Sequence, residues 1–235
     1  MPRIDAFALG RQGPRPTMED RHVLSVTGQT AWGGVFDGHR GEEVSDYAAA
    51  AMPGLFELSA ADALRRLEVG SRRLPSGACA VVFRLDGDDL QVANLGDCEL
   101  ALVEDGHAAV VTQLHRVSNP RERQRVLEAG GVIDGPYVMD LSTGNGLMPT
   151  RTLGDDDFAA VGVSGEVSEW AGKLDDGWVV AACDGLWDVL NPEELPAFLE
   201  GSSPEDVARR LVDEALKTRG SHDNVTVLVL HRTPS

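Results

Sequence analysis

The sequence predicts an α+β protein in which a β-sandwich is covered by helices. Short β-type runs separated by turn signals recur along the chain, and helical patterns stand in separate blocks and do not alternate with single strands. Two late runs, Trp178–Cys183 and Val225–Leu230, are almost wholly apolar, which is typical of central strands buried on both faces. With 235 residues the chain has the size of one domain with a substantial core, so we expect a single domain over 1–235.

The remaining β-type runs lie in the first half of the chain. Turn residues such as Asp86-Gly87-Asp88 and Glu104-Asp105-Gly106 separate them. Strands are expected at Arg3–Leu9, Val23–Val26, Ala31–Phe36, Ala78–Leu85, Leu90–Leu95, Glu99–Glu104 and His107–Thr112.

Four segments have helical patterns. Asn119 precedes Pro120 and is a good N-cap, and Ser203 stands in the same position before Pro204. Helices are expected at Glu42–Ala51, Ala60–Val69, Asn119–Gly130 and Pro204–Thr218.

The composition of the chain indicates which binding partners and which cellular compartment to expect. The net charge of −17 disfavours nucleic acid and anionic membranes as partners. No apolar run exceeds six residues, whereas a membrane span needs about 20, and no signal peptide is visible. The three cysteines form no Cys-x-x-Cys pair, which indicates buried thiols in a reducing cytoplasm. Nineteen arginines against two lysines suggest a bacterial source with high GC content.

Several acidic residues stand at the ends of apolar strands. Asp37 ends WGGVFDGH, Asp184 ends WVVAACDG, and Asp223 opens HDNVTVLVL. Glu19 and Asp20 directly precede another predicted strand. Taken one at a time, each Asp-Gly is better explained as a turn, and Glu19-Asp20 equally well as two solvated loop acids.

Their combination favours a metal site. Carboxylates brought together without a counter-ion raise one another's pKa, and a hard divalent cation removes that conflict. Ligation by oxygen alone points to magnesium or manganese, and two such ions can assist displacement at phosphorus.

At this point the chain resembles a known family, the metal-dependent serine/threonine protein phosphatases of type 2C (PPM family). Eight stretches match in order over nearly the whole length. They are RPTMED (15–20), VFDGHRG (35–41), SGACAVVF (76–83), ANLGDCEL (93–100), SNPRERQRVLEAGG (118–131), TRTLGD (150–155), ACDGLWDVL (182–190) and HDNVTVLVL (222–230). The resemblance implies a four-layer α-β-β-α sandwich and hydrolysis of phosphoserine or phosphothreonine by a metal-bridging water or hydroxide.

The resemblance also implies roles for single residues. Asp37 matches the acid that bridges two Mn²⁺ or Mg²⁺ ions, and Gly38 matches a residue that offers its carbonyl to one of them. Asp184 and Asp223 match ligands of the other ion.

Four further roles follow from the same resemblance. Glu19 matches an acid of the metal shell, and Asp20 one that binds metal-ligated water. Arg15 matches the arginine that holds the substrate phosphate, and His39 the proposed general acid.

Other positions are expected to support the site or the fold. Arg151 and Asp155 match recurring family residues of a supporting shell, and Asn224 is expected to orient Asp223 or cap a turn. The segment Val132–Pro149 lies where the family carries a flap, and its glycines and polar residues suggest a mobile loop. The histidines without ligand-like spacing are expected to be structural or exposed; they are His22, His107, His115 and His222.

Leu114 departs from the family pattern, which usually has an aspartate there that helps to bind a third metal. Leucine cannot ligate a metal, so the third site should be weak or absent, or be built from other groups. Three functions stay open at this level: a phosphatase opposing a serine/threonine kinase, a regulatory module with weak catalysis, and a phosphatase of small metabolites. For the first we expect a monomer that acts on phosphorylated proteins.

Overall fold

The core of the protein is a pair of antiparallel sheets. The computed structural model describes residues 2–234. The first sheet has the order β1-β14-β13-β6-β7. Its strands are β1 (Arg3–Arg11), β14 (Val225–Thr233), β13 (Gly177–Ala182), β6 (Glu99–Glu104) and β7 (His107–Val110). The second has the order β12-β5-β4-β3-β2, with β11 also paired to β4. Its strands are β12 (Ser168–Lys173), β5 (Asp89–Leu95), β4 (Gly77–Asp86), β3 (Thr30–His39), β2 (Arg21–Thr27) and β11 (Leu153–Gly154).

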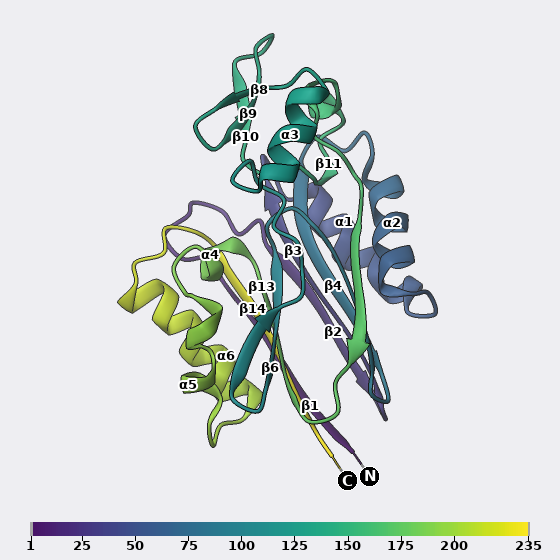
Figure 1. The fold of residues 1–235 in the computed structure, drawn as a ribbon, viewed down its shortest axis with the longest axis vertical. Helices are drawn as coiled ribbons and strands as arrows, with labels where there is room; N and C mark the ends of the chain where they lie inside the picture. The colour runs from purple at the N-terminus through teal and green to yellow at the C-terminus, as the bar shows by residue number, and fades with distance from the viewer. Residues whose placement is uncertain (1, 235) are drawn as a thin grey trace.

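Helices cover the outer face of each sheet (Figure 1). The helices α1 (Glu43–Ala51) and α2 (Ala60–Ser71) pack on the second sheet through residues such as Leu64 and Leu67. The helices α4 (Asp184–Trp187), α5 (Pro196–Leu199) and α6 (Pro204–Asp213) pack on the first sheet. Together with the two sheets they form four layers, and the predicted α+β sandwich is confirmed.

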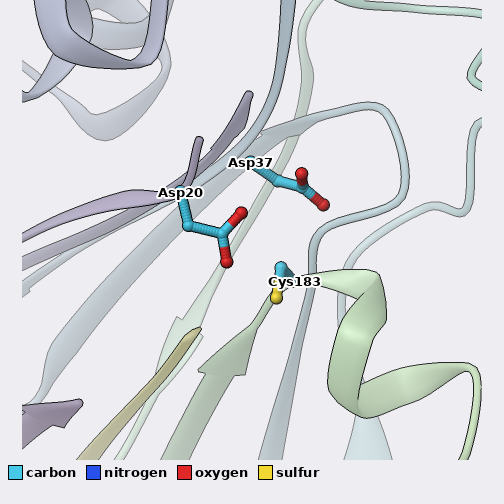
Figure 2. Close-up of side chains that lie close together, drawn as sticks. All are labelled: Asp20, Asp37 and Cys183. Carbon is cyan, nitrogen blue, oxygen red and sulfur yellow. The ribbon is translucent and has the colours of Figure 1, made fainter. Parts of the chain in front are cut away.

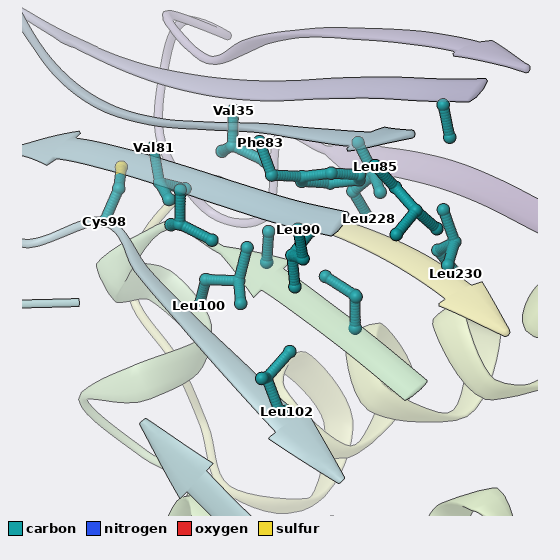
Figure 3. Packing of buried hydrophobic residues seen from close by; sticks show 14 of the residues in the cluster. Val35, Val81, Phe83, Leu85, Leu90, Cys98, Leu100, Leu102, Leu228 and Leu230 are labelled. Atoms are coloured by element: carbon teal, nitrogen blue, oxygen red, sulfur yellow. The ribbon is translucent and has the colours of Figure 1, made fainter. Parts of the chain in front are cut away.

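The space between the sheets is filled by fully buried side chains of both sheets (Figure 3). Phe83 and Val35 of the second sheet meet Leu100 and Leu228 of the first. Alternate residues of these strands point outward to the helices, which is why the central strands are apolar almost throughout. This double burial holds the strand ends that carry the acidic residues in fixed positions.

Most predicted elements lie within a few residues of their observed bounds. The helix predicted to begin at Asn119 is α3 (Pro120–Glu128), with the Asn119 side chain accepting a hydrogen bond from the Arg121 N–H as N-cap. The predicted helix Pro204–Thr218 ends as an α-helix at Asp213, and one π-helical turn follows at Glu214–Thr218. The edge strand β12 was not predicted, because half of its residues face solvent and Gly172 interrupts it.

The segment Val132–Pro149, where the resemblance predicts a flap, contains a small sheet. It holds the three short strands β8 (Val132–Asp134), β9 (Tyr137–Asp140) and β10 (Asn145–Leu147). Val138 and Leu147 are buried with residues of α3, and this apolar contact stabilises the sheet against the body of the protein. Figure 1 shows α3 and this sheet at the end of the sandwich that is opposite the two termini.

Within residues 2–234, none of the helices is long and apolar enough to cross a membrane.

Candidate metal centre and active site

The predicted site residues come together at one end of the sandwich. Asp37 lies near the end of β3, Asp184 begins α4 shortly after the end of β13, and Asp223 lies just before β14. These positions belong to both sheets, and together they line a pocket of about 450 Å³. All the predicted site residues except Asp20 line this pocket: Arg15, Glu19, Asp37, Gly38, His39, Asp184 and Asp223.

Asp20 lies beside the pocket, with its carboxylate buried near those of its neighbours. A ligand atom of Asp20 lies within 4.8 Å of one on Asp37 and one on Cys183 (Figure 2). The residue is only 2% exposed, and neither carboxylate oxygen has a hydrogen-bond partner among the described residues. Burial raises the pKa of Asp20. A buried carboxylate without partners is costly, so this group fits a site completed by a cation or by water that a cation holds.

A second group of acids meets at Asp37. One oxygen each from Asp37, Asp97 and Asp184 lies within 4.8 Å of the others. Burial raises the pKa of Asp37 well above its usual value, and the charge of Asp20 adds to this. Burial, with the charge of Asp97, raises the pKa of Asp184 to about 8. Carboxylates in this state fit a hard divalent cation, which would let all of them ionise together.

Cys183 is the only sulfur ligand in these two groups among the described residues. Burial raises the pKa of its thiol well above the usual value. A neutral thiol is a poor ligand, so the donors suited to a cation here are oxygens. The three cysteines are free and buried, as predicted.

Asp97 is a site residue that the sequence analysis did not select. It is 3% exposed and lines the pocket directly after β5, in the turn that leads to β6. Asp97 also follows an apolar strand, but Gly96 stands before it, whereas in Asp37-Gly38 and Asp184-Gly185 the acid comes first and the glycine second. A Gly-Asp pair after a strand is typical of a turn, so the sequence offers no separate signal for a site residue here.

The loop that carries Arg15 and Glu19 is tied to the start of β14. The Asn224 side chain donates to the carbonyls of Gln12 and Thr17 and accepts from the Glu19 N–H. Arg15 itself pairs with Asp223, with 2.6 Å between NH2 and Oδ2, and its side chain is about half exposed. The guanidinium therefore lies at the pocket rim against a predicted metal ligand.

His39 is held by a buried carboxylate. Its Nε2 lies 2.7 Å from Oδ2 of Asp155, whose side chain is fully buried, and Arg40 NH2 lies 2.5 Å from the other oxygen. Burial acts to raise the pKa of Asp155, but the hydrogen bond from His39 and the charge of Arg40 outweigh it and lower this pKa. Asp155 is therefore ionised, Nε2–H of His39 is the donor, and Nδ1 is the nitrogen left for the pocket.

The predicted supporting residues lie around this centre. Asp155 contacts His39 directly, whereas Arg151 pairs with Glu122 in α3 at 2.6 Å. His115 is buried, accepts a hydrogen bond from the Gly96 N–H at Nδ1, and has a pKa lowered to about 4 by burial. It is thus structural, as predicted, and it fixes the turn that carries Asp97.

Leu114 does not line the pocket, and its carbonyl accepts a hydrogen bond from the Asn119 side chain. Two residues further on, Arg116 reaches the acid cluster. Its guanidinium pairs with Asp97, Asp184 and Asp188, and it too was not selected from the sequence.

The chain is similar to known proteins over nearly all of its length. A sequence model described as Protein phosphatase 2C matches residues 5–225. The chain is 33% identical to a protein kinase and PP2C-like domain-containing protein of Arabidopsis thaliana, an alignment that covers 100% of this chain and 40% of that protein. It is 34% identical to protein phosphatase 1F of Rattus norvegicus, over 92% of this chain and 55% of the relative. The chain thus spans about half of the length of these relatives or less.

Solved structures show the same fold. A sex-determining protein of C. elegans superposes with a TM-score of 0.83 and 26% identity, over 97% of this chain and 64% of the other. A serine-threonine phosphatase 2C of Toxoplasma gondii superposes with a TM-score of 0.84 and 20% identity, over 97% and 95% of the two chains. Because the family match covers most of the chain, this protein belongs to the protein phosphatase 2C family.

Proposed function

We propose that this chain hydrolyses phosphoserine and phosphothreonine monoesters in proteins, with two Mn²⁺ or Mg²⁺ ions as cofactors. The observation that carries the proposal is the buried acid cluster. Asp20, Asp37 and Asp184 are held together with raised pKa values, and the carboxylate of Asp20 has no partner within residues 2–234. The family to which the chain belongs, and the names of its relatives as protein phosphatases, supply the substrate class.

The acidic residues of the site would bind the two ions as follows. Asp37 would be shared by both, Glu19 and the carbonyl of Gly38 would serve one ion, and Asp184 and Asp223 would serve the other. Asp20 would accept hydrogen bonds from water around the ions. When bound, the ions would supply charge neutralisation and an activated water for attack at phosphorus.

Arg15 is proposed to bind the substrate phosphate. Its fork of N–H donors suits two phosphate oxygens, and its partner Asp223 is one of the proposed metal ligands. A cation bound to Asp223 would weaken the attraction that holds Arg15 there, and the half-exposed guanidinium would then be free to bind a phosphate.

His39 is proposed as the general acid. Its Nε2–H is fixed by Asp155, so the ring is oriented and Nδ1 can give a proton to the leaving alkoxide of serine or threonine. Asp155 also stabilises the positive charge of the protonated ring.

The proposal is tested by the hydrolysis of a phosphothreonine peptide with and without Mn²⁺. We expect Mn²⁺-dependent release of phosphate that Asp184→Asn lowers by about a hundredfold or more, because the second ion loses a charged ligand. Asp213→Asn, at an exposed site on α6, is the matched control and should keep full activity. A folded wild-type protein that binds the peptide without releasing phosphate would instead indicate a binding module.

The substrate class is tested by a second comparison. Rates on phosphopeptides are measured beside those on small phosphomonoesters such as sugar phosphates. We expect kcat/KM to favour the peptides, and a preference for the small substrates would contradict the assignment to proteins. A cognate kinase, a bacterial source, a cytoplasmic location and a monomeric state remain parts of the same hypothesis.

A further inference from the structure

Arg116 lies between acids that come from three different parts of the chain. Its Nε is 2.6 Å from Oδ2 of Asp97, NH2 is 2.7 Å from Oδ2 of Asp184, and NH1 is 2.7 Å from Oδ1 of Asp188. These acids follow β5, begin α4 and follow α4, respectively. All three line the same pocket as Asp37.

The guanidinium is shielded and permanently charged. The side chain of Arg116 is 16% exposed, and that of Asp97 is 4% exposed. An arginine guanidinium is not deprotonated in proteins, so this group stays positively charged. Arginine offers N–H donors only, so the carboxylate oxygens that pair with Arg116 accept hydrogen bonds from it. The guanidinium is part of the chain and therefore stays in the site.

We propose that Arg116 is an internal cation that occupies this side of the acid cluster and thereby sets how many divalent ions the cluster binds. The proposal rests on the metal centre proposed above. Oδ2 of Asp184 is held by Arg116, so this acid is left with one oxygen for an ion beside Asp37. Asp97, which has an oxygen close to those of Asp37 and Asp184, likewise accepts a hydrogen bond from the guanidinium through Oδ2.

Removal of the guanidinium would create a different site. Asp97, Asp184 and Asp188 would lose their shared cation, in a pocket that Asp37 also lines and beside the buried Asp20. Such a cluster of carboxylates is a ligand set for one more hard divalent cation. Arg116 thus acts as a positioning and stoichiometry-determining residue and makes no contact with the substrate in this proposal.

The test counts bound ions and does not depend on turnover. Metal-free wild type, Arg116→Ala, Arg116→Lys and Arg219→Ala are dialysed against Mn²⁺, and the bound metal per folded chain is measured by atomic absorption. Arg219 is the matched control, because its guanidinium also bridges two carboxylates, Glu194 and Glu214, but does not line the pocket.

We expect two Mn²⁺ ions in wild type and in Arg219→Ala, and three in Arg116→Ala. Arg116→Lys keeps the positive charge and should retain two. Asp188→Asn, added to Arg116→Ala, should weaken the binding of the third ion about tenfold or more, since it removes one of the charged ligands. If Arg116→Ala does not fold, as judged by circular dichroism, Arg116→Gln supplies a neutral side chain of similar reach for the same count.

Two outcomes would overturn the proposals in distinguishable ways. Two bound ions in wild type and the same two in folded Arg116→Ala or Arg116→Gln would refute the role of Arg116 alone. A wild-type protein that binds no Mn²⁺ would refute the proposed metal centre and the role of Arg116 with it.

Discussion

Individual carboxylates at this site are held in surroundings that disfavour their charge. Asp20 is almost fully buried without a hydrogen-bond partner in the described chain, and Asp37 is surrounded by other acids. An ordinary protein core excludes such groups or pairs them. Asp155 shows the opposite solution next to the pocket, since His39 and Arg40 both pair with its carboxylate. Asp20 and Asp37 thus fit the role of cation ligands, whereas Asp155 holds His39 in place.

The role of His39 can be tested through the leaving group. His39→Ala should lower kcat on a phosphoserine peptide by about a hundredfold, because the serine alkoxide needs a proton to leave. On an aryl phosphate such as p-nitrophenyl phosphate, whose leaving group is a stable anion, the loss should be only a few-fold. Asp155→Asn should show the same pattern more weakly, since it loosens the ring. Equal losses of kcat on the two substrates would argue against general-acid catalysis by His39.

At the scale of the elements, the site depends on how closely neighbouring strands and turns approach. Gly77 begins β4, pairs with His39 at the end of β3, and is buried against Asp155. A Cβ at this position would overlap both Oδ2 of Asp155 and Nε2 of His39. The contact between these two side chains therefore requires a glycine on the neighbouring strand.

Gly77→Ala should separate His39 from Asp155 and cost about 1–3 kcal/mol of stability through overpacking. We expect a loss of peptide-phosphatase activity that resembles that of Asp155→Asn, measured with the same pair of substrates, together with a lower unfolding midpoint. Gly54→Ala is the control, because a Cβ there meets no atom within 4 Å. Wild-type kinetics and stability in Gly77→Ala would show that the approach of these strands does not matter for the site.

At the scale of the whole molecule, the acid cluster makes stability depend on pH when metal is removed. The folded protein raises the pKa of Asp184 to about 8, whereas the unfolded chain leaves it near 3.8. Between these values the folded state binds more protons, so its stability falls as the pH rises and levels off above about 8. His115 has the opposite effect below its unfolded pKa of 6.5, because burial lowers its pKa to about 4. The effect of the acids is therefore best seen above pH 6.5.

In EDTA, the thermal midpoint should decrease from pH 6.5 to pH 9, as measured by circular dichroism. Each unit by which folding raises the pKa of Asp184 changes the free energy of unfolding by about 1.4 kcal/mol. A shift of one unit is therefore enough to change the thermal midpoint measurably. Mn²⁺ should restore more stability at pH 9 than at pH 6.5, because fewer protons compete for the ligands. Asp184→Asn should flatten the EDTA profile over this range, and an unchanged slope in that variant would place the effect elsewhere.

The sequence alone predicts the central strands, four of the helices and the acids at the strand ends. Apolar runs such as Val225–Leu230 indicate burial on both faces whatever lies around them, and helix caps such as Asn119 act within a few residues. Short-range patterns of this kind are readable because their physical causes are local. The resemblance to the family added the roles of single acids, and the structure brings those acids to one pocket.

Which charged side chains meet depends on the tertiary fold. Arg116 is 68 positions from Asp184, and Arg15 is 208 from Asp223, so no local pattern could pair them. The same holds for the missing partners of Asp20, which follow from the closure of two sheets around it. Electrostatic pairing depends on distance in space, whereas sequence patterns record distance along the chain. The chain alone therefore predicts an acidic metal centre, and its fold shows that an arginine already holds one side of it.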